Sequence, residues 1–286
     1  MEDLGHLQAR LASIGELLEI VGAMRSLAAA RMQQAQQALE GVRRYQQVVA
    51  DAIASALPLV AETAGPTPRR SEPGWLIVFC SQHGFAGPFN ERMLDAAQSV
   101  LAGEGGRLCI VGARGALRAD ERRLEVPWSQ PMATQVGGVL ETARKLEAEL
   151  YRRLEAGEAA RVEVLFSSPE PDGRLAQHRI SLLPLALEAF AAKTSRVAPL
   201  HNLPARPLAE KLIAEYVFAG LVRAAMGSLL GENASRLRAM EVAHQNIADK
   251  QQELRQLERE AQQEQTTSEM LDVVTGAEAL LRGRPR

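Results

Sequence analysis

Proline is missing from both ends of this 286-residue chain and is concentrated in its middle. The chain has 14 prolines, yet none lies between Met1 and Leu57 or between Leu208 and Arg284. A proline inside a helix removes a backbone donor and clashes with the preceding turn, at a cost of about 3 kcal/mol. Both ends can therefore form uninterrupted helices, on the order of 80 Å and 110 Å long at ~1.5 Å per residue. Because no ordinary globular core is that wide, we expect the two helices to cover each other.

Aromatic residues make up only 4% of the chain, and its two cysteines, Cys80 and Cys109, lie in apolar runs. We interpret these cysteines as buried hydrophobic residues in a reducing compartment. The formal net charge of -2 gives no basic surface for nucleic acid. The acidic start is unlike a signal peptide, and we find no run of about 18 apolar residues. We therefore expect no membrane span, and any membrane association would go through a partner.

The residues needed for nucleotide, metal or hydrolytic chemistry are also missing. A Walker A loop needs a glycine before its lysine, and no glycine precedes any lysine of this chain. The segment Gly84-Phe85-Ala86-Gly87 is only a fragment of a dinucleotide-binding fingerprint. The five histidines have no metal-ligand spacing, and we interpret His83, at the end of an expected strand, as a loop histidine. The sequence thus predicts no cofactor, no metal site and no catalytic residue.

Apolar residues recur at alternating three- and four-residue spacing along both ends, as is typical of a coiled-coil seam. In the N-terminal helix the seam is Leu4, Leu7, Leu11, Ile14, Leu18, Val21, Met24, Ala28, Ala35, Leu39, Val42, Val49 and Ile53. In the C-terminal helix it is Leu237, Met240, His244, Ile247, Gln251, Leu254, Leu257 and Ala261. The two polar seam residues either fix the register or face solvent. Between residues 23 and 32 the surface is mostly Ala and Met, which permits close approach of another surface or tight packing within the pair.

The middle of the chain alternates short apolar runs with amphipathic stretches. We expect strands at 75–80, 107–112, 162–167 and 179–183, helices at 90–102, 114–120 and 136–155, and a loop between Pro127 and Pro131. This alternation predicts a small α/β domain with a mostly parallel, Rossmann-like sheet. Proline-rich stretches at 64–73 and 199–207 are predicted linkers, and Pro58 is expected to end the first helix. The predicted domains are therefore a coiled-coil helix at 1–58, the α/β domain at 74–200 and a second coiled-coil helix at 208–284.

Three blocks resemble the gamma subunit of F-type ATP synthases, and the resemblance covers nearly the whole chain. Residues 20–32, IVGAMRSLAAARM, are similar to the family pattern I-T-x-A-M-x-x-V-A-A-x-K-M. Residues 232–246, ENASRLRAMEVAHQN, are similar to E-x-A-x-R-M-x-A-M-x-x-A-x-x-N, and residues 267–277, TSEMLDVVTGA, fit T-x-E-x-x-[DE]-x-x-x-G-A. The chain departs from the family pattern at Gln82, His83, Ala86, Pro88, Arg259 and Gln262.

The resemblance implies an antiparallel, asymmetric coiled coil inside a ring of alpha and beta subunits. The α/β domain would bind epsilon and the c-ring, on the cytoplasmic side of the bacterial inner membrane, as a peripheral part of the F1 sector. The chain would be a non-catalytic rotor shaft that couples ion flow to ATP synthesis or hydrolysis. Contacts between rotor and stator would involve Met24, Arg31, Met32, Gln263, Glu269, Asp272 and Gly276. Interhelical and central packing would involve Ala23, Ala28, Glu232, Arg236, Met240, Ala243 and Asn246.

Two other classes of function were weighed against this resemblance. The heptads alone also permit a coiled-coil adaptor whose non-catalytic α/β domain docks an unrelated partner. A nucleotide-dependent enzyme of the doubly wound class is disfavoured by the missing phosphate-binding loops.

Overall fold

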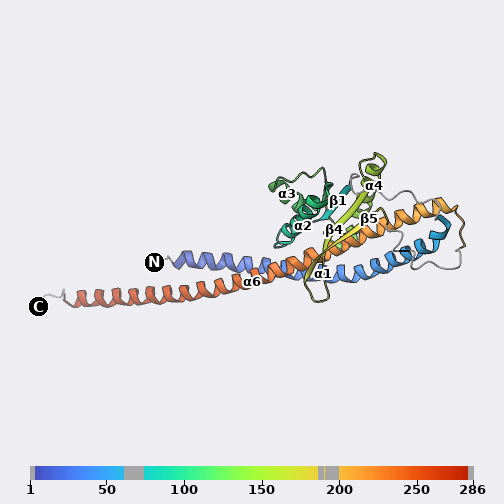
Figure 1. The fold of residues 1–286 in the computed structure, drawn as a ribbon. Helices are drawn as coiled ribbons and strands as arrows, with labels where there is room; N and C mark the ends of the chain where they lie inside the picture. Colours follow the sequence, from blue (N-terminus) through green and yellow to red (C-terminus); the bar gives the residue numbers. More distant parts are fainter. Residues whose placement is uncertain (1–3, 61–73, 186–189, 191–199, 283–286) are drawn as a thin grey trace. The chain divides into compact units, whose positions relative to one another are not determined.

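The computed structural model describes residues 4–60, 74–185, 190 and 200–282 (Figure 1). The chain forms two compact units, Met1–Ser26 with Met240–Arg286, and Leu27–Ala239. The predicted linker at 64–73 lies outside the described residues, as does most of 186–199. The domain boundaries 1–58, 74–200 and 208–284 therefore stay predictions.

Two long helices come from the two ends of the chain, as the missing prolines predicted. Helix α1 spans Leu4–Val60 and helix α6 spans Ala205–Arg282. The structure differs from the predictions at one end of each helix. Pro58 lies inside α1 instead of ending it, and Pro207 lies in the first turn of α6. A proline is tolerated in a first turn, because the backbone N–H groups there have no partner within the helix.

Within each unit the two helices run antiparallel. In the first unit, Arg25 of α1 pairs with Glu241 of α6 at 3.4 Å, and Gly15 faces the side chain of Gln251. From Gly15 to Arg25 the residue number on α1 rises by ten, while the facing residue on α6 falls by ten, from Gln251 to Glu241. In the second unit, Leu39 lies near Gly227, whereas Val49 and Ile53 pack in a cluster with Leu212 and Tyr216. The predicted antiparallel coiled coil is confirmed.

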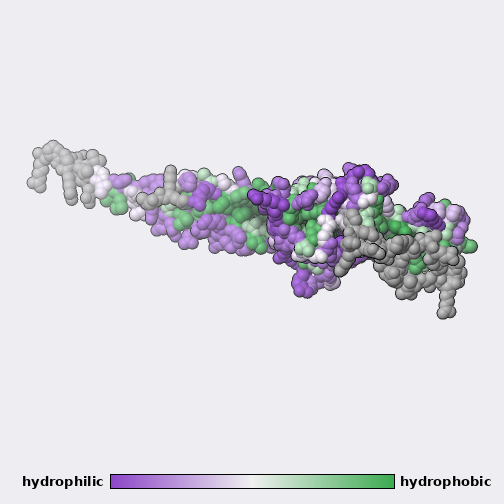
Figure 2. Space-filling model, turned by 45° about the horizontal axis from the view of Figure 1, so that its top comes forward, coloured by the Kyte–Doolittle hydropathy of each residue, from purple (hydrophilic) through white to green (hydrophobic). Residues whose placement is uncertain are grey.

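The predicted seam is buried or half-buried at every position of α1. The same holds for α6 from Leu237 to Ala261, including the polar residues His244 and Gln251, with the single exception of Leu257. Beyond Ala261 the pattern ends, and every residue from 262 to 276 is exposed. In the space-filling view of Figure 2, hydrophobic residues coloured green still appear on the surface among purple hydrophilic ones.

The second unit contains a five-stranded sheet in the order β3-β2-β1-β4-β5. The strands are β1 (Gly74–Phe79), β2 (Arg107–Val111), β3 (Trp128–Gln130), β4 (Arg161–Pro169) and β5 (Leu175–Leu183). All pairs are parallel except β4 with β5, so the prediction of a small, mostly parallel sheet is confirmed. The loop expected between Pro127 and Pro131 contains the short edge strand β3, which the sequence analysis missed.

Helices cover both faces of this sheet. Helices α2 (Phe89–Glu104) and α3 (Ala113–Glu121) pack on the face that carries Leu76, Val78 and Leu165. The other face carries Ile77 and Phe166 and is covered by α4 (Val139–Glu155) together with α1 and α6. A 3-10 turn, η1 (Val136–Gly138), precedes α4.

One part of α6 corrects the expectation that no apolar run reaches the length of a membrane span. Among the described residues, α6 alone contains an 18-residue window that is apolar enough, with a hydropathy of 1.4. Within the protein 61% of that window is buried. A helix that covers a sheet face has this composition because its neighbours are apolar.

Candidate functional site

Helix α6 touches the end of β4 with its backbone, and two glycines make this possible. A Cβ atom at Gly231 would lie 3.0 Å from the carbonyl carbon of Ser167 and closer still to its oxygen. A Cβ atom at Gly227 would lie 2.8 Å from the ring of Phe166. Residues four apart share one face of a helix, so both glycines face the sheet. The approach is therefore closer than any residue with a side chain would allow.

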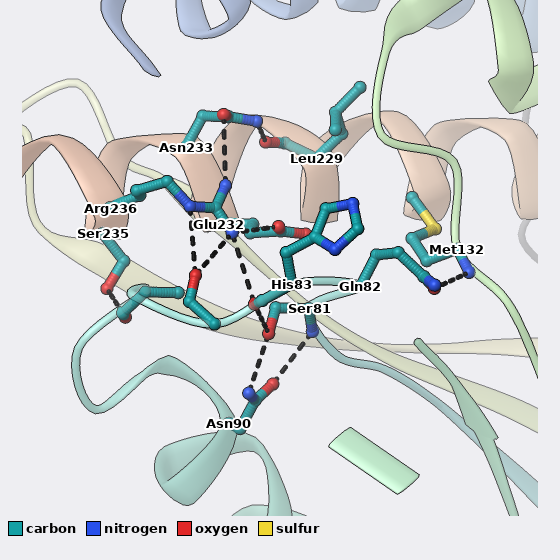
Figure 3. A network of polar contacts seen from close by, with 12 residues as sticks. Ser81, Gln82, His83, Asn90, Met132, Leu229, Glu232, Asn233, Ser235 and Arg236 are labelled. Carbon is teal, nitrogen blue, oxygen red and sulfur yellow. Dashed lines mark hydrogen bonds and ion pairs between the residues drawn. The ribbon is translucent and has the colours of Figure 1, made fainter. Parts of the chain in front are cut away.

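A buried ion pair follows these glycines on α6. Arg236 binds Glu232 at 2.6 Å, and their side chains are only 9% and 4% exposed. The Arg236 guanidinium also donates to the backbone oxygens of His83 and Gly84, at distances of 3.2 to 3.4 Å (Figure 3). It thereby joins α6 to the loop between β1 and α2. Burial raises the pKa of the Glu232 carboxyl, and Arg236 and the backbone N–H of Gln82 oppose that shift.

The loop that Arg236 holds is fixed by its own polar contacts (Figure 3). The Ser81 backbone N–H donates to Asn90 Oδ1 at 2.9 Å, and Asn90 Nδ2 donates back to Ser81 Oγ at 2.8 Å. Ser235 of α6 donates to the backbone oxygen of Ala86 at 2.7 Å. Because each of these groups is buried, losing one partner would leave the other unsatisfied, at a cost of about 1–3 kcal/mol.

Gln82, one of the departures from the family pattern, connects this loop to its neighbours. Its Oε1 accepts from the backbone N–H of Met132 at 2.8 Å and from that of Ala113 at 3.2 Å. The His83 side chain is exposed. Among the described residues, no cluster of three or more His, Cys, Asp or Glu side chains could hold a metal ion. The loop therefore serves as a junction between secondary-structure elements.

This junction lies where doubly wound sheets usually bind ligands. The chain proceeds from β1 to β2 and β3 on one side and returns to β4 on the other, which makes the β1/β4 boundary a topological switch point. In this protein Gly231, Glu232 and Arg236 of α6 cover the carboxyl ends of these strands on one face of the sheet. The helix thus occupies much of the crevice that a nucleotide would need.

The residues predicted for central packing are divided between buried and exposed positions. Glu232, Arg236, Met240 and Ala28 are buried, and Ala243 is half-buried. Ala23 and Asn246 lie on exposed helix surface. The structure brings Glu232 and Arg236 together, and their hydrogen bonds to described residues lie within α6 and to the β1–α2 loop.

The residues predicted for the rotor–stator contact lie on both long helices. Met24, Arg31 and Met32 of α1 are half-buried. Gln263, Glu269, Asp272 and Gly276 lie in the fully exposed part of α6. Met270, Leu271, Val273 and Val274 lie in the same part and are 56% to 72% exposed. Their predicted role in contacting another subunit stays a prediction.

Sequence reasoning missed the two glycines and most of the loop contacts. A recognisable signal existed for the glycines, because Gly227 and Gly231 stand four residues apart inside an apolar helical stretch. The contacts of Ser81, Gln82 and Ser235 join residues far apart in the sequence, which no local pattern predicts.

Comparisons with known proteins agree with this architecture. A family model described as ATP synthase matches residues 3–280. The ATP synthase gamma chain of Anaeromyxobacter sp. (strain K) is 28% identical over 291 residues, covering 98% of this chain and 100% of that protein. The ATP synthase gamma chain of Syntrophobacter fumaroxidans is also 28% identical, over 297 residues, with 98% and 99% covered.

Solved structures show the same fold at lower identity. A chain of the Euglena gracilis mitochondrial ATP synthase, OSCP/F1/c-ring, in rotational state 3, matches with a TM-score of 0.64 at 14% identity, covering 98% of this chain and 95% of that one. A chain of the Tetrahymena thermophila central stalk/c-ring matches with a TM-score of 0.59 at 17% identity, covering 78% and 99%. The resemblance to gamma subunits is thus confirmed, and the chain belongs to the ATP synthase family.

Proposed function

We propose that this chain is the central rotor shaft of an F-type ATP synthase. As a non-catalytic gamma subunit, it couples ion-driven rotation of the c-ring to conformational change at the catalytic sites of the alpha/beta ring. The chain belongs to this family, and one observation carries the proposal. Its paired long helices expose an apolar surface.

That surface has two parts within the first unit. On α1, Leu17 and Ile20 are about half exposed and three residues apart, so they share a face. On α6, every residue from 262 to 276 is exposed, and four of them have large apolar side chains. Exposed apolar patches of this kind mark surfaces that another protein covers. The alpha and beta subunits are the partners that the family membership suggests.

The proposed partners of the sheet-containing unit are epsilon and the c-ring. The names of two solved neighbours support the c-ring as a partner, since one comes from a central stalk/c-ring and the other from a rotor. The chain would then lie on the cytoplasmic side of the bacterial inner membrane and be held there by the complex. Met24, Arg31, Met32, Gln263, Glu269, Asp272 and Gly276 are the proposed contacts with the stator.

The mechanism follows from differential contact. A ligand or partner shifts a conformational equilibrium only by binding two states with different free energy. Catalytic sites that are otherwise equivalent can therefore differ only if each meets a different side of an asymmetric shaft. The two helices supply such a shaft, because their lengths and side chains differ.

Co-expression with alpha, beta and epsilon subunits from the same genome tests the proposal. Affinity purification through a tag on beta should recover one copy of this chain per alpha/beta ring, measured by native mass spectrometry. The Ile20→Glu variant should reduce that recovery, because it places a charge on the exposed apolar surface. Gln37→Glu, which adds the same charge at an exposed polar position of α1, is the matched control. Rings that assemble without this chain, or capture of an unrelated protein instead, would contradict the rotor assignment.

A further inference from the structure

A hollow of about 140 Å³ is lined by residues of α2, β4, β5 and α6. Its polar wall comes from Arg92 of α2, Ser167 of β4, Gln177 of β5 and Ser235 of α6. Phe89 and Met93 of α2 supply apolar lining. All of these residues belong to the second unit, and none of the described residues that line the hollow carries a carboxylate.

Ser167 is the residue that first suggests a ligand. It is only 4% exposed, and its side chain points to the face of the sheet covered by α2, because Leu165, two residues earlier, packs there. Its hydroxyl makes no hydrogen bond to any described residue, whereas the hydroxyl of the neighbouring Ser168 lies 3.0 Å from His178 Nε2. Among the described residues, the fully enclosed side-chain oxygen that lacks a partner is that of Ser228, so the Ser167 hydroxyl is open to the hollow. A hydrogen-bonding group that enters the hollow would give this hydroxyl the partner it lacks.

The other polar side chains also offer donors. Gln177 pairs with Ser167 across the two strands, and its amide donates to the backbone oxygen of Arg92 at 2.8 Å. Since an amide nitrogen has two hydrogens, one remains available. The Arg92 guanidinium forms no ion pair with any described residue, although Glu91 beside it pairs with Arg118 and Arg122. A positive charge, a hydroxyl and an amide therefore line one hollow that lacks a negative charge.

Size limits what this hollow can hold. A cavity of about 150 Å³ accommodates a molecule as large as benzene, whereas sites for drug-sized ligands begin near 300 Å³. The hollow is therefore too small for a nucleotide and suits a molecule of a few heavy atoms. Its position also fits, since open α/β sheets bind ligands outside the carboxyl ends of their strands at a switch point.

From these observations we infer that the hollow binds a small oxyanion, a carboxylate or a phosphate, held by Arg92, Ser167 and Gln177. The bound oxyanion contacts α2, β4 and β5 and lies against Ser235 of α6. Its binding stabilises the packing of these elements, because a ligand that binds only the folded state raises its stability. This site is separate from the proposed stator contacts, so its failure would leave the rotor assignment intact.

Calorimetric titration of the full-length chain with inorganic phosphate tests the inference. A second titration with propionate separates a phosphate from a carboxylate preference, and sodium chloride at matched ionic strength serves as the blank. We expect saturable binding of at least one oxyanion and a rise in melting temperature at saturation. Backbone amide NMR signals of Ser167 and Gln177 should shift during the titration.

Two variants and one control decide the assignment. Ser167→Ala removes only the unpartnered hydroxyl and should weaken binding about tenfold or more, the usual effect of losing a hydrogen bond to a charged group. Arg92→Ala should weaken it at least as much. Arg144→Ala removes an exposed arginine of α4 and should leave binding unchanged. The inference is overturned if neither anion binds, if the three variants bind alike, or if the shifted NMR signals lie elsewhere.

Discussion

Replacing Gly231 with alanine would show whether backbone contact holds α6 against the sheet. The added Cβ atom would lie 3.0 Å from the carbonyl carbon of Ser167. Carbon atoms prefer a separation of about 3.5–4.0 Å, so α6 or β4 would have to move by roughly 0.5–1 Å. Overpacking of this kind costs about 1–3 kcal/mol. The neighbouring groups are backbone atoms, which cannot rotate away as a flexible side chain can.

Two further terms act on the same variant. Alanine is about 1 kcal/mol more favourable than glycine inside a helix, which offsets part of the clash. The Arg236 hydrogen bonds to Gly84 and His83 are already 3.2 to 3.4 Å long, so a further displacement would break them. We therefore expect Gly231→Ala to lower the free energy of unfolding by about 1–3 kcal/mol, since the lost bonds outweigh the gain in helix propensity.

Urea denaturation followed by circular dichroism measures this change, and two glycines provide controls. Gly41 is exposed on α1 with nothing within 4 Å of an added Cβ, so Gly41→Ala should be stabilising by about 0.5–1 kcal/mol. Gly220→Ala would meet side-chain atoms and no backbone: the end of Leu182 at 2.6 Å and Gln46 Nε2 at 3.9 Å. The free energy of unfolding of Gly220→Ala should therefore lie between those of the other two variants. If Gly231→Ala were as stable as Gly41→Ala, α6 would not be held by its backbone, and the reasoning would fail.

Three other predictions concern the ion pair, the exposed end of α6 and Met24 in the Ala- and Met-rich segment 23–32. Arg236→Met should destabilise the fold by about 3–5 kcal/mol because it leaves a buried carboxylate unpaired. It should also raise the pKa of Glu232 further, so the folded state would keep a proton that the unfolded state releases above about pH 4.5. The loss, measured by denaturation, should therefore be larger at pH 8 than at pH 5; an equal loss at both would exclude this explanation. Ending the chain after Ala261 should leave the melting temperature nearly unchanged, because residues 262–276 are exposed, yet reduce co-purification with alpha and beta. A large drop in melting temperature would show that this segment supports the fold. Met24→Lys should make ATP hydrolysis by the assembled complex less well coupled to ion transport, and unchanged coupling would remove Met24 from the proposed contacts.

The long helices could be predicted because their signals are local. The absence of proline and the three–four apolar spacing can each be recognised within a single helix. Both predicted seams agree with the observed burial. The predicted α6 seam ends at Ala261, and the burial ends there too. Leu257 continues the spacing but is 40% exposed, since α1 supplies few residues that far along the register. Pro58 is expected to end the helix, but α1 continues two residues past it, to Val60.

The sheet could be predicted from its apolar runs, whereas the contacts of the site could not. Strands β1 and β2 are buried on both faces and read as almost continuous apolar stretches, while β4 has the shorter apolar run Val164–Phe166. Strand β3 has three residues at the sheet edge, too few for any periodicity. Glu232 and Arg236 were recognised as packing residues, but their partners, His83 and Gly84, lie about 150 residues away in the sequence. An i, i+4 charged pair within an apolar helix was the available signal for a buried ion pair.

Helix α6 passes through three successive environments along its length, and their order bears on the proposed rotor. From Val217 to Arg236 it is nearly all buried against the sheet and α1, from Leu237 to Ala261 it has one buried seam, and from 262 to 276 it has none. The whole span is one continuous helix, so a force that displaces β4 acts on the same backbone that carries the exposed residues. Because α6 meets β4 through Gly227 and Gly231, that force does not pass through long, flexible side chains at this contact. A shaft that transmits torque needs such a stiff junction, and the glycines provide it only while position 231 remains without a side chain.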